Sequence, residues 1–210
     1  MVVVVQASVP EELAQLRRWC TWASTPNEQG RLTKRPDCST KNPAAWRTLE
    51  EVLLELEPSE LGGIGFVFTG GVQLGGRTVY AFDLDACRDP MTGAIEPWAL
   101  EVLDAHGRSY TEVTPSGTGL RQWVRVRTPP PFLRRAKVKL KYPAAPNVPA
   151  HKSVELQVFG YGVPQFVAFS GRHLPGTSSD IDEVPDLRWL CERFGVEAGA
   201  AEPAKGLPVG

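Results

Sequence analysis

Two aspartates stand inside an apolar run in the segment TVYAFDLDAC, residues 78–87. Side chains alternate along a strand, so Asp83 and Asp85 share one face while Phe82 and Leu84 take the other. Neighbouring carboxylates repel each other, and burying either without a partner is costly. A divalent cation removes both penalties, and Mg²⁺ is commonly held by one or two carboxylates together with substrate phosphates. The alternative is that the strand ends here and that both aspartates are exposed to solvent.

A third acid breaks an apolar strand pattern further along the chain, in SVELQVFG. Glu155 alternates with Val154 and Leu156 and therefore takes the opposite face of its strand. If this strand lies beside the 78–85 strand, three carboxylates converge. Three acids with two divalent ions are the usual apparatus of in-line phosphoryl or nucleotidyl transfer. The alternative for Glu155 is a half-exposed strand with ordinary outward polar residues.

A polar, glycine-rich turn lies between two strand-like segments in YTEVTPSGTGLRQWVRV. Its glycines let backbone N–H groups approach a phosphate, and its hydroxyls add contacts. A row of guanidiniums beside such a turn suits a triphosphate or a nucleic-acid backbone. A plain hairpin with a charged, solvated edge is the alternative. The residues concerned are Ser116, Gly117 and Thr118 in the turn, and Arg121, Arg125 and Arg127 in the strand.

Two further polar groups follow an apolar strand directly, in QFVAFSGRHL. Ser170 and Arg172 are candidates for contact with a phosphate or a sugar. We expect His173 to be a loop residue and His106 to cap the end of a helix.

Composition limits the class of protein. The 24 acidic and 23 basic residues nearly cancel, which excludes a uniformly basic nucleic-acid binder but allows a local basic stripe. The four cysteines form no C-x-x-C pair, so we expect neither a zinc site nor a disulfide framework, but reduced cysteines in a cytoplasmic protein. No apolar run reaches membrane length. The opening MVVVVQ is expected to be a strand, and residues 197–210 a flexible linker.

Several elements must position these residues. Capping boxes predict helices over about 9–18, from Ser8 and Glu11, and over about 42–56, from Thr48 and Glu51. Further helices are expected near 96–106 and 185–194, the first ended by Gly107. Apolar runs predict strands in GIGFVFTG and TVYAFDLD, and strand pairs of SYTEVTP with LRQWVRVR and of SVELQVFG with QFVAFSG.

The order of these elements indicates an α+β fold. We expect the strands after residue 63 to form one mostly antiparallel sheet, backed by the two later helices. At 210 residues, the chain suits one large domain or two small lobes.

Taken together and in order, these segments resemble the archaeo-eukaryotic primase superfamily, and specifically the primase-polymerase domain at the front of phage and plasmid replication proteins. RRWCTW with GRLTKRP resembles the family's amino-terminal Trp and Lys-x-Pro region, and NPAAWRTLEEV resembles its following helix. GIGFVFTG and VYAFDLDACRDPMTGAIEPWA resemble its hydrophobic D-x-D motif with the flanking strand and helix, while YTEVTPSGTGLR and VELQVFG…QFVAFSG resemble the second and third motifs. The resemblance covers roughly residues 15–190.

The resemblance implies an RRM-like, mostly antiparallel catalytic sheet over about 63–196, joined to a smaller amino-terminal α/β lobe over about 1–62. Asp83, Asp85 and Glu155 match the family's carboxylates, which bind two catalytic Mg²⁺ or Mn²⁺ ions. Ser116 matches the small polar residue of the second motif, and Arg121 stands where the family has a histidine. Arginine keeps the positive charge and can clamp phosphate, but it cannot serve as a titratable imidazole.

The activity implied is template-dependent nucleotidyl transfer, as a DNA primase or DNA polymerase of a phage, plasmid or other mobile element. Its partners would be a DNA template and primer, dNTPs or NTPs, and a downstream or separate helicase, with no membrane. Basic residues suited to the nucleic-acid backbone are Lys34, Arg134, Arg135, Lys137 and Lys139. Lys34 could equally be a solvated lysine in a loop. The basic run LRRAKVKLK could equally be the charged face of an edge strand, where lysines discourage aggregation. Two alternatives are a replication-initiator DNA-binding module with a weakened or lost site, and a metal-dependent nuclease.

Overall fold

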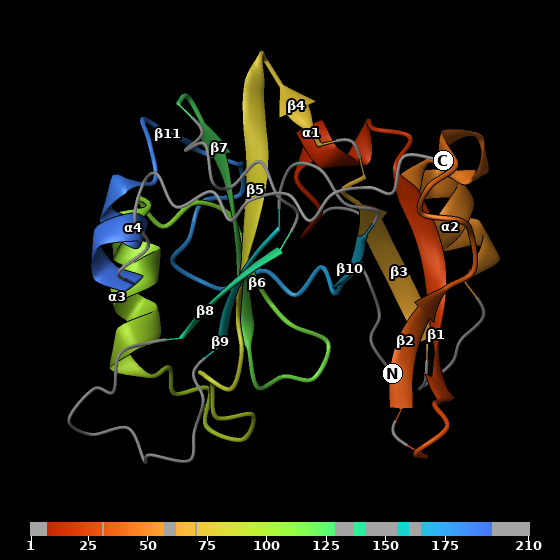
Figure 1. Ribbon diagram of the computed structural model, residues 1–210, viewed down its shortest axis with the longest axis horizontal. Coiled ribbons are helices and arrows are strands. Elements are labelled where there is room, and N and C mark those ends of the chain that lie inside the picture. Colours follow the sequence, from red (N-terminus) through yellow and green to blue (C-terminus); the bar gives the residue numbers. More distant parts are fainter. Residues whose placement is uncertain are drawn as a thin grey trace, which may run out of the picture.

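A computed structural model describes residues 8–30, 32–56, 62–69, 71–128, 137–141, 155–159 and 165–194 (Figure 1). The fold is mixed α+β, with two sheets built mainly from antiparallel strands and with few helices, as the order of elements predicted. The predicted opening strand, the 197–210 linker, Arg134 and Arg135 lie outside the described residues. Within those residues, none of the helices has the length and apolar character needed to cross a bilayer.

The first sheet has four antiparallel strands in the order β10-β3-β1-β2 and stands on the right in Figure 1. Strand β2 is one edge of this sheet, and it pairs with β1 from Trp22 opposite Pro36 to Pro26 opposite Leu32. The strands are β1 (Trp19–Pro26), β2 (Leu32–Pro36), β3 (Gly62–Val67) and β10 (Phe166–Phe169).

The second sheet has the order β11-β7-β5-β9-β8, with β4 added to β5 and β6 added to β7. All of its strand pairs are antiparallel except the parallel pair of β11 and β7. The strands are β4 (Gln73–Leu74), β5 (Arg77–Leu84), β6 (Thr111–Val113), β7 (Leu120–Val126), β8 (Lys137–Lys141), β9 (Glu155–Phe159) and β11 (Glu183–Val184).

Helices lie beside both sheets. Helices α3 and α4 lie side by side beside the second sheet, and α2 lies beside the first (Figure 1). The helices are α1 (Glu11–Ala14), α2 (Leu49–Glu55), α3 (Pro97–Ala105) and α4 (Arg188–Phe194), with a 3₁₀ turn at Pro43–Ala45.

Strand β5 separates two hydrophobic cores. Tyr80, Phe82 and Leu84 pack with side chains from α3 and α4, whereas Val79 and Ala81 pack toward the first sheet. Since odd-numbered positions of β5 face the first sheet, Asp83 lies on the face that looks between the two sheets.

Two predicted helices are shorter than the sequence indicated. Helix α1 covers only Glu11–Ala14, and its first residue follows Pro10 without a side-chain cap, so the box predicted from Ser8 is wrong. The chain from Trp19 is instead drawn into β1, because pairing with β3 satisfies its backbone and buries its tryptophans. The capping box of Thr48 and Glu51 is confirmed at the start of α2.

The predicted helix over 42–56 is broken in the middle. Asn42 accepts a hydrogen bond from the N–H of Ala44 and starts only the 3₁₀ turn. Trp46 then has an extended conformation, and Arg47 forms a bridge with Trp19, so the backbone there is bound to β1 rather than to a helix.

The expected arrangement of the later strands is wrong in two respects. Strands β9 and β10 do not pair with each other: β9 lies between β5 and β8, while β10 pairs with β3 in the first sheet. The strands after residue 63 therefore form parts of two sheets, and β3 and β10 join the amino-terminal strands. The hairpin of β6 and β7 and the helix ended by Gly107 are confirmed.

Candidate functional site

The condition for convergence of the three acids is met, because β9 pairs directly with β5. The register sets Asp83 opposite Gln157 and Leu84 opposite Leu156. Glu155 is the first residue of β9, and Asp85 lies in the turn directly after Leu84, so both are at the same end of this strand pair. The backbone thus brings the three predicted metal ligands to neighbouring positions at one end of two adjacent strands.

Asp83 has a cationic partner on its other side. Arg121 lies opposite Asp83 on β7, and its Nη2 donates to both carboxylate oxygens at 3.2 Å. Glu112 lies opposite Arg121 on β6, and Arg121 Nη1 donates to its Oε1 at 3.2 Å. An acid–base–acid row, Asp83–Arg121–Glu112, therefore crosses three neighbouring strands.

Glu112 is completely buried and fully bonded. Its Oε2 accepts hydrogen bonds from Ser170 N at 2.8 Å, Ser170 Oγ at 3.0 Å and Gly171 N at 3.0 Å. Burial raises the pKa of Glu112, and Arg121 and the two backbone N–H groups oppose that rise. Sequence reasoning missed this residue, although it is an acid inside a predicted strand, in SYTEVTP.

The guanidinium of Arg121 is buried and hydrogen-bonded to protein groups, rather than exposed to a ligand. Only 4% of it is exposed, and its Nη1 also donates to the carbonyl of Ala168 in β10. Burial alone would lower the pKa of Arg121, but Asp83 and Glu112 outweigh it and raise that pKa. To clamp a phosphate through both terminal nitrogens, the guanidinium would have to leave at least one carboxylate.

Ser170, a predicted nucleotide contact, is also hydrogen-bonded within the protein. It is fully buried, and its hydroxyl bonds to Glu112 and to the carbonyl of Val113. It links β10 of the first sheet to β6 of the second.

The glycine-rich turn closes against the end of β5. Ser116 and Thr118 are exposed, and their hydroxyls lie 3.0 Å apart, while Gly117 has a φ of +81°. A Cβ on Gly119 would stand 2.8 Å from the carbonyl oxygen of Leu84, so only glycine fits this approach. The turn is therefore packed next to Asp83 and Asp85, as its predicted role requires.

Two guanidiniums hold this turn. Arg88 Nη1 donates to the carbonyl of Gly117 at 3.0 Å, and Arg172 Nη2 donates to the carbonyl of Thr114. Burial, followed by the like charge of Arg88, lowers the pKa of Arg172. Arg88 was missed in the sequence because it stands alone after the D-x-D motif. An anion bound here would relieve the repulsion between the two guanidiniums.

Lys34 comes to the same region from the first sheet. It is exposed on β2, with its Nζ 5.3 Å from the ring centroid of Trp22. Partial burial of the ammonium and the charge of Arg121 lower its pKa, against the opposing effect of Asp83, Asp85 and Glu112. Lys34 is thus within electrostatic range of the acids on β5, which no sequence spacing could have shown.

The other predicted basic residues lie elsewhere. Arg125 donates to Glu12 at 2.8 Å, and Arg127 donates to Glu183 at 2.6 Å, so both are paired toward the far end of β7. Lys137 and Lys139 belong to β8, the edge strand next to β9, and the register sets Lys139 opposite Gln157.

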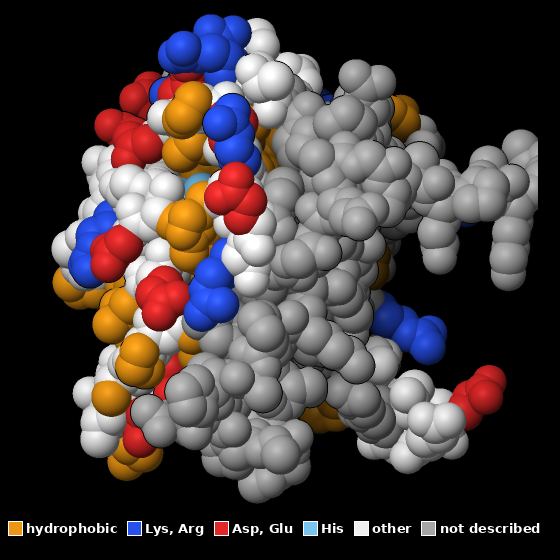
Figure 2. All heavy atoms as spheres, turned by 60° about the vertical axis from the view of Figure 1, so that its left-hand side comes forward, with side chains coloured by type: hydrophobic (Ala, Val, Ile, Leu, Met, Phe, Trp, Pro, Cys, Tyr) orange, Lys and Arg blue, Asp and Glu red, His pale blue; other side chains and the backbone are white. Residues whose placement is uncertain are grey.

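Figure 2 shows the face that carries α3 and α4, where basic, acidic and hydrophobic side chains are interspersed among the described residues. Arg193 of α4, for example, pairs with Glu101 of α3. Such mixed charge does not favour this face as a nucleic-acid interface.

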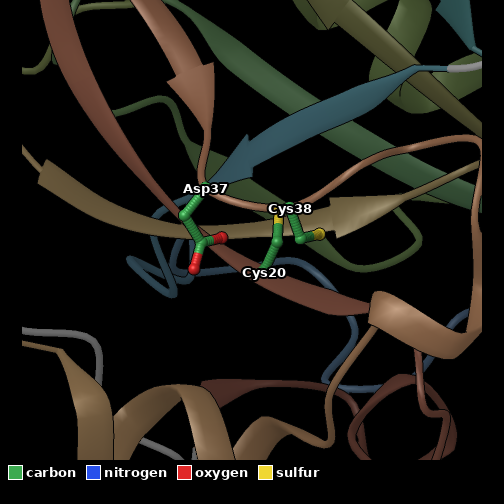
Figure 3. A group of neighbouring side chains, drawn as sticks. All are labelled: Cys20, Asp37 and Cys38. Carbon is green, nitrogen blue, oxygen red and sulfur yellow. The ribbon is translucent and has the colours of Figure 1, made fainter.

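A second group of ligand-type side chains lies away from these acids. Cys20, Asp37 and Cys38 come together where the end of β2 passes β1 (Figure 3). Burial raises the pKa of both thiols.

No protein-family model matches this chain, and neither does any curated protein.

Proposed function

We propose that this protein catalyses template-dependent nucleotidyl transfer, as a DNA primase or DNA polymerase of a mobile genetic element. The observation that carries the proposal is the pairing of β9 with β5, in which Gln157 lies opposite Asp83 and Glu155 begins β9 at the end of β5 that leads into Asp85. The sequence resemblance requires these three acids to meet, although Glu155 is about seventy residues from the D-x-D motif.

The architecture supports the finer fold assignment. An RRM-like core is an antiparallel sheet with helices packed on one face. Here α3 and α4 cover one face of the second sheet, and Asp83 lies on the opposite face, toward the first sheet. We infer that the second sheet is the RRM-like catalytic sheet and that the site faces the space between the sheets.

The donor set fits hard divalent cations. Carboxylate oxygens are the ligands that Mg²⁺ and Mn²⁺ prefer, and Asp83, Asp85 and Glu155 would hold the ions. Two ions so held would supply the Lewis-acid chemistry that activates the attacking 3′-hydroxyl and stabilises the leaving pyrophosphate. Asp83 would share its carboxylate with Arg121, whose hydrogen bonds to both carboxylate oxygens fix its orientation.

The remaining residues would bind and orient the substrates. Arg172 and Arg88, beside the 116–119 turn, are placed for the triphosphate, since both are cationic and border the acid end of β5. Lys34 approaches from the first sheet and would contact a phosphate of the template, primer or nucleotide.

The decisive experiment is extension of a labelled primer on a template, with dNTPs or NTPs and either Mg²⁺ or Mn²⁺. We expect extension by the wild type and its loss in Asp83→Asn and Asp85→Asn, which keep side-chain size. Asp104→Asn, at an exposed acid of α3 paired with Arg108, is the matched control and should retain full activity. Equal extension by all three variants would refute the assignment of the site, and degradation of the strand would favour a nuclease.

A second candidate is a replication-initiator DNA-binding module with a weakened active site. The observation that favours it is the bidentate pair between Arg121 and Asp83, because a guanidinium already neutralises the acid that a metal would need. DNA binding without extension in either metal would select this candidate. Arg121→His, which introduces the residue of the resembled family, should then restore metal-dependent extension if the pair is what blocks it.

A further inference from the structure

The cysteines at positions 20 and 38 face each other across the first hairpin. The β1–β2 register sets Trp22 opposite Pro36, and the N–H of Asp37 donates to the carbonyl of Thr21 at 3.0 Å. Continuing the same register places Cys20 opposite Cys38. This is a non-hydrogen-bonded pair position, where opposite side chains approach most closely.

We propose that Cys20, Cys38 and Asp37 form a binding site for one thiophilic divalent ion of the Zn²⁺ type. One ligand atom from each of the three residues lies within 4.8 Å of the other two (Figure 3). Two sulfurs bound to one tetrahedral zinc ion stand about 3.8 Å apart, given Zn–S bonds of about 2.3 Å. The three groups are thus gathered to nearly the separation that a single ion requires.

The chemistry of the donors distinguishes this site from the three-acid site on β5. Two thiolates with one carboxylate select a soft or borderline ion such as Zn²⁺, whereas an all-carboxylate set selects Mg²⁺ or Mn²⁺. Three protein ligands leave one tetrahedral position for water. Cys38 is half-buried and Asp37 is exposed, so an ion can reach the site from solvent, while Cys20 is fully buried.

Arg47 provides the outer support that a ligating carboxylate needs. Its guanidinium donates to Oδ2 of Asp37 and also to Glu55, so it holds Asp37 from the side of α2. Two thiolates and a carboxylate around a divalent ion leave one net negative charge, which the guanidinium of Arg47 offsets. The hydrophobic side chains of Trp46, Val67 and Phe166 surround the cysteines and restrict water.

The ion would fasten the end of β2 to β1. Strand β2 is an edge strand whose residues are mostly exposed, and it carries Lys34 four positions before Cys38. We therefore infer a structural role, in which the ion fixes the strand that presents Lys34. The site is independent of the proposed nucleotidyl transfer, since it shares no ligand with it.

The test is metal binding by the full-length protein after reduction and removal of metal with a chelator. We expect one equivalent of Zn²⁺ in competition with a chromophoric chelator, and thiolate-to-metal charge-transfer absorption with Co²⁺ in its place. Cys38→Ser, at a half-buried position, should lower the affinity more than tenfold and abolish that absorption band. Asp37→Asn should also lower the affinity, because a neutral amide oxygen binds a divalent ion less strongly than a carboxylate does.

Cys87→Ser is the matched control, because Cys87 is as buried as Cys20 but lies in the core of the second sheet. It should bind Zn²⁺ as the wild type does. Equal binding by Cys38→Ser, or no binding by the reduced wild type, would overturn the proposal. A protein that binds no metal and instead loses two hydrogens in mass on mild oxidation would show a redox pair at this position.

Discussion

An arginine–carboxylate pair lies near each end of β7, with Arg127 one residue beyond the strand, and the two pairs differ in burial. At the site end, the side chain of Arg121 is 5% exposed between Asp83 and Glu112. At the far end, the side chain of Arg127 is 61% exposed and pairs with Glu183. Both contacts join an arginine to a carboxylate on a neighbouring strand, so exposure to solvent is the main difference between them.

The comparison shows where such pairs set structure. An exposed pair is screened by water, and its formation restricts two long side chains, so it contributes little. Breaking a buried pair leaves an uncompensated charge in a medium that solvates it poorly. The row of Asp83, Arg121 and Glu112 therefore fixes the site end of the sheet, while Arg127 is free to exchange partners.

The largest effect is expected from Arg121→Met. The change leaves Glu112 and Asp83 without their shared cation and should lower the free energy of unfolding by about 3–5 kcal/mol. Denaturation in urea, followed by tryptophan fluorescence, measures this. Arg127→Met is the matched control and should stay close to the wild type. Equal losses in both variants would mean that burial does not decide the difference.

A smaller effect is expected from Gly119→Ala, which tests how closely the turn packs on the same row. The added Cβ would meet the backbone oxygen of Leu84 at 2.8 Å, so the turn must shift, at a cost of about 1–3 kcal/mol. The same urea measurement applies. Ser116→Ala, at an exposed position of the same turn, serves as the control, and a stable Gly119→Ala would indicate that the turn can move freely.

His106 extends the comparison to a buried titratable group without a charged partner. It is 2% exposed at the end of α3, where its ring lies 4.8 Å from Phe82 and its Nδ1 lies 2.8 Å from the carbonyl of Val102. Burial lowers the pKa of His106, and the contact with Val102 only partly opposes this.

In the folded protein, His106 therefore binds a proton less readily than it does in the unfolded chain, where its pKa has the usual value of 6.5. Stability from this group is present above that value and is lost as pH falls toward the lowered one. We expect the wild type to lose unfolding free energy relative to His106→Phe as the pH falls from about 7 to about 5. Parallel pH profiles would contradict this.

The smallest effect on stability is expected from Lys34→Met, because Lys34 is exposed and makes no buried contact with the row. Its effect should appear in binding instead. The slope of log affinity for a primer–template against log salt concentration should fall by about 1. Arg35→Met, at the next and also exposed position of β2, is the control, and equal slopes in both variants would remove Lys34 from the site.

Local features of the fold were predictable from the sequence. The capping box of Thr48 and Glu51, the stop at Gly107 and the hairpin of β6 and β7 each depend on residues close together in the chain. The placement of Asp83 on one face of β5 also followed from alternation alone, whereas Asp85 lies in the turn directly after the strand.

Partners distant in sequence were not predictable in the same way. The turn-like YGVP segment suggested that the strands on either side of it pair, yet β9 pairs with β5 and β10 pairs with β3 in the other sheet. Glu112 was missed because its significance lies in Ser170 and Gly171, which reach it from the end of β10. The pair of Cys20 and Cys38 carries no spacing motif, since the hairpin register brings the two residues together.

The return of β10 to the first sheet has a consequence for biosynthesis. Strand β3 ends at Val67, but its outer neighbour begins only at Phe166, after the chain has passed through most of the second sheet. A nascent chain on the ribosome must therefore hold β3 with one open edge until β10 has emerged. Unpaired edges recruit other strands, so translation arrested before residue 166 should yield fragments that associate with one another.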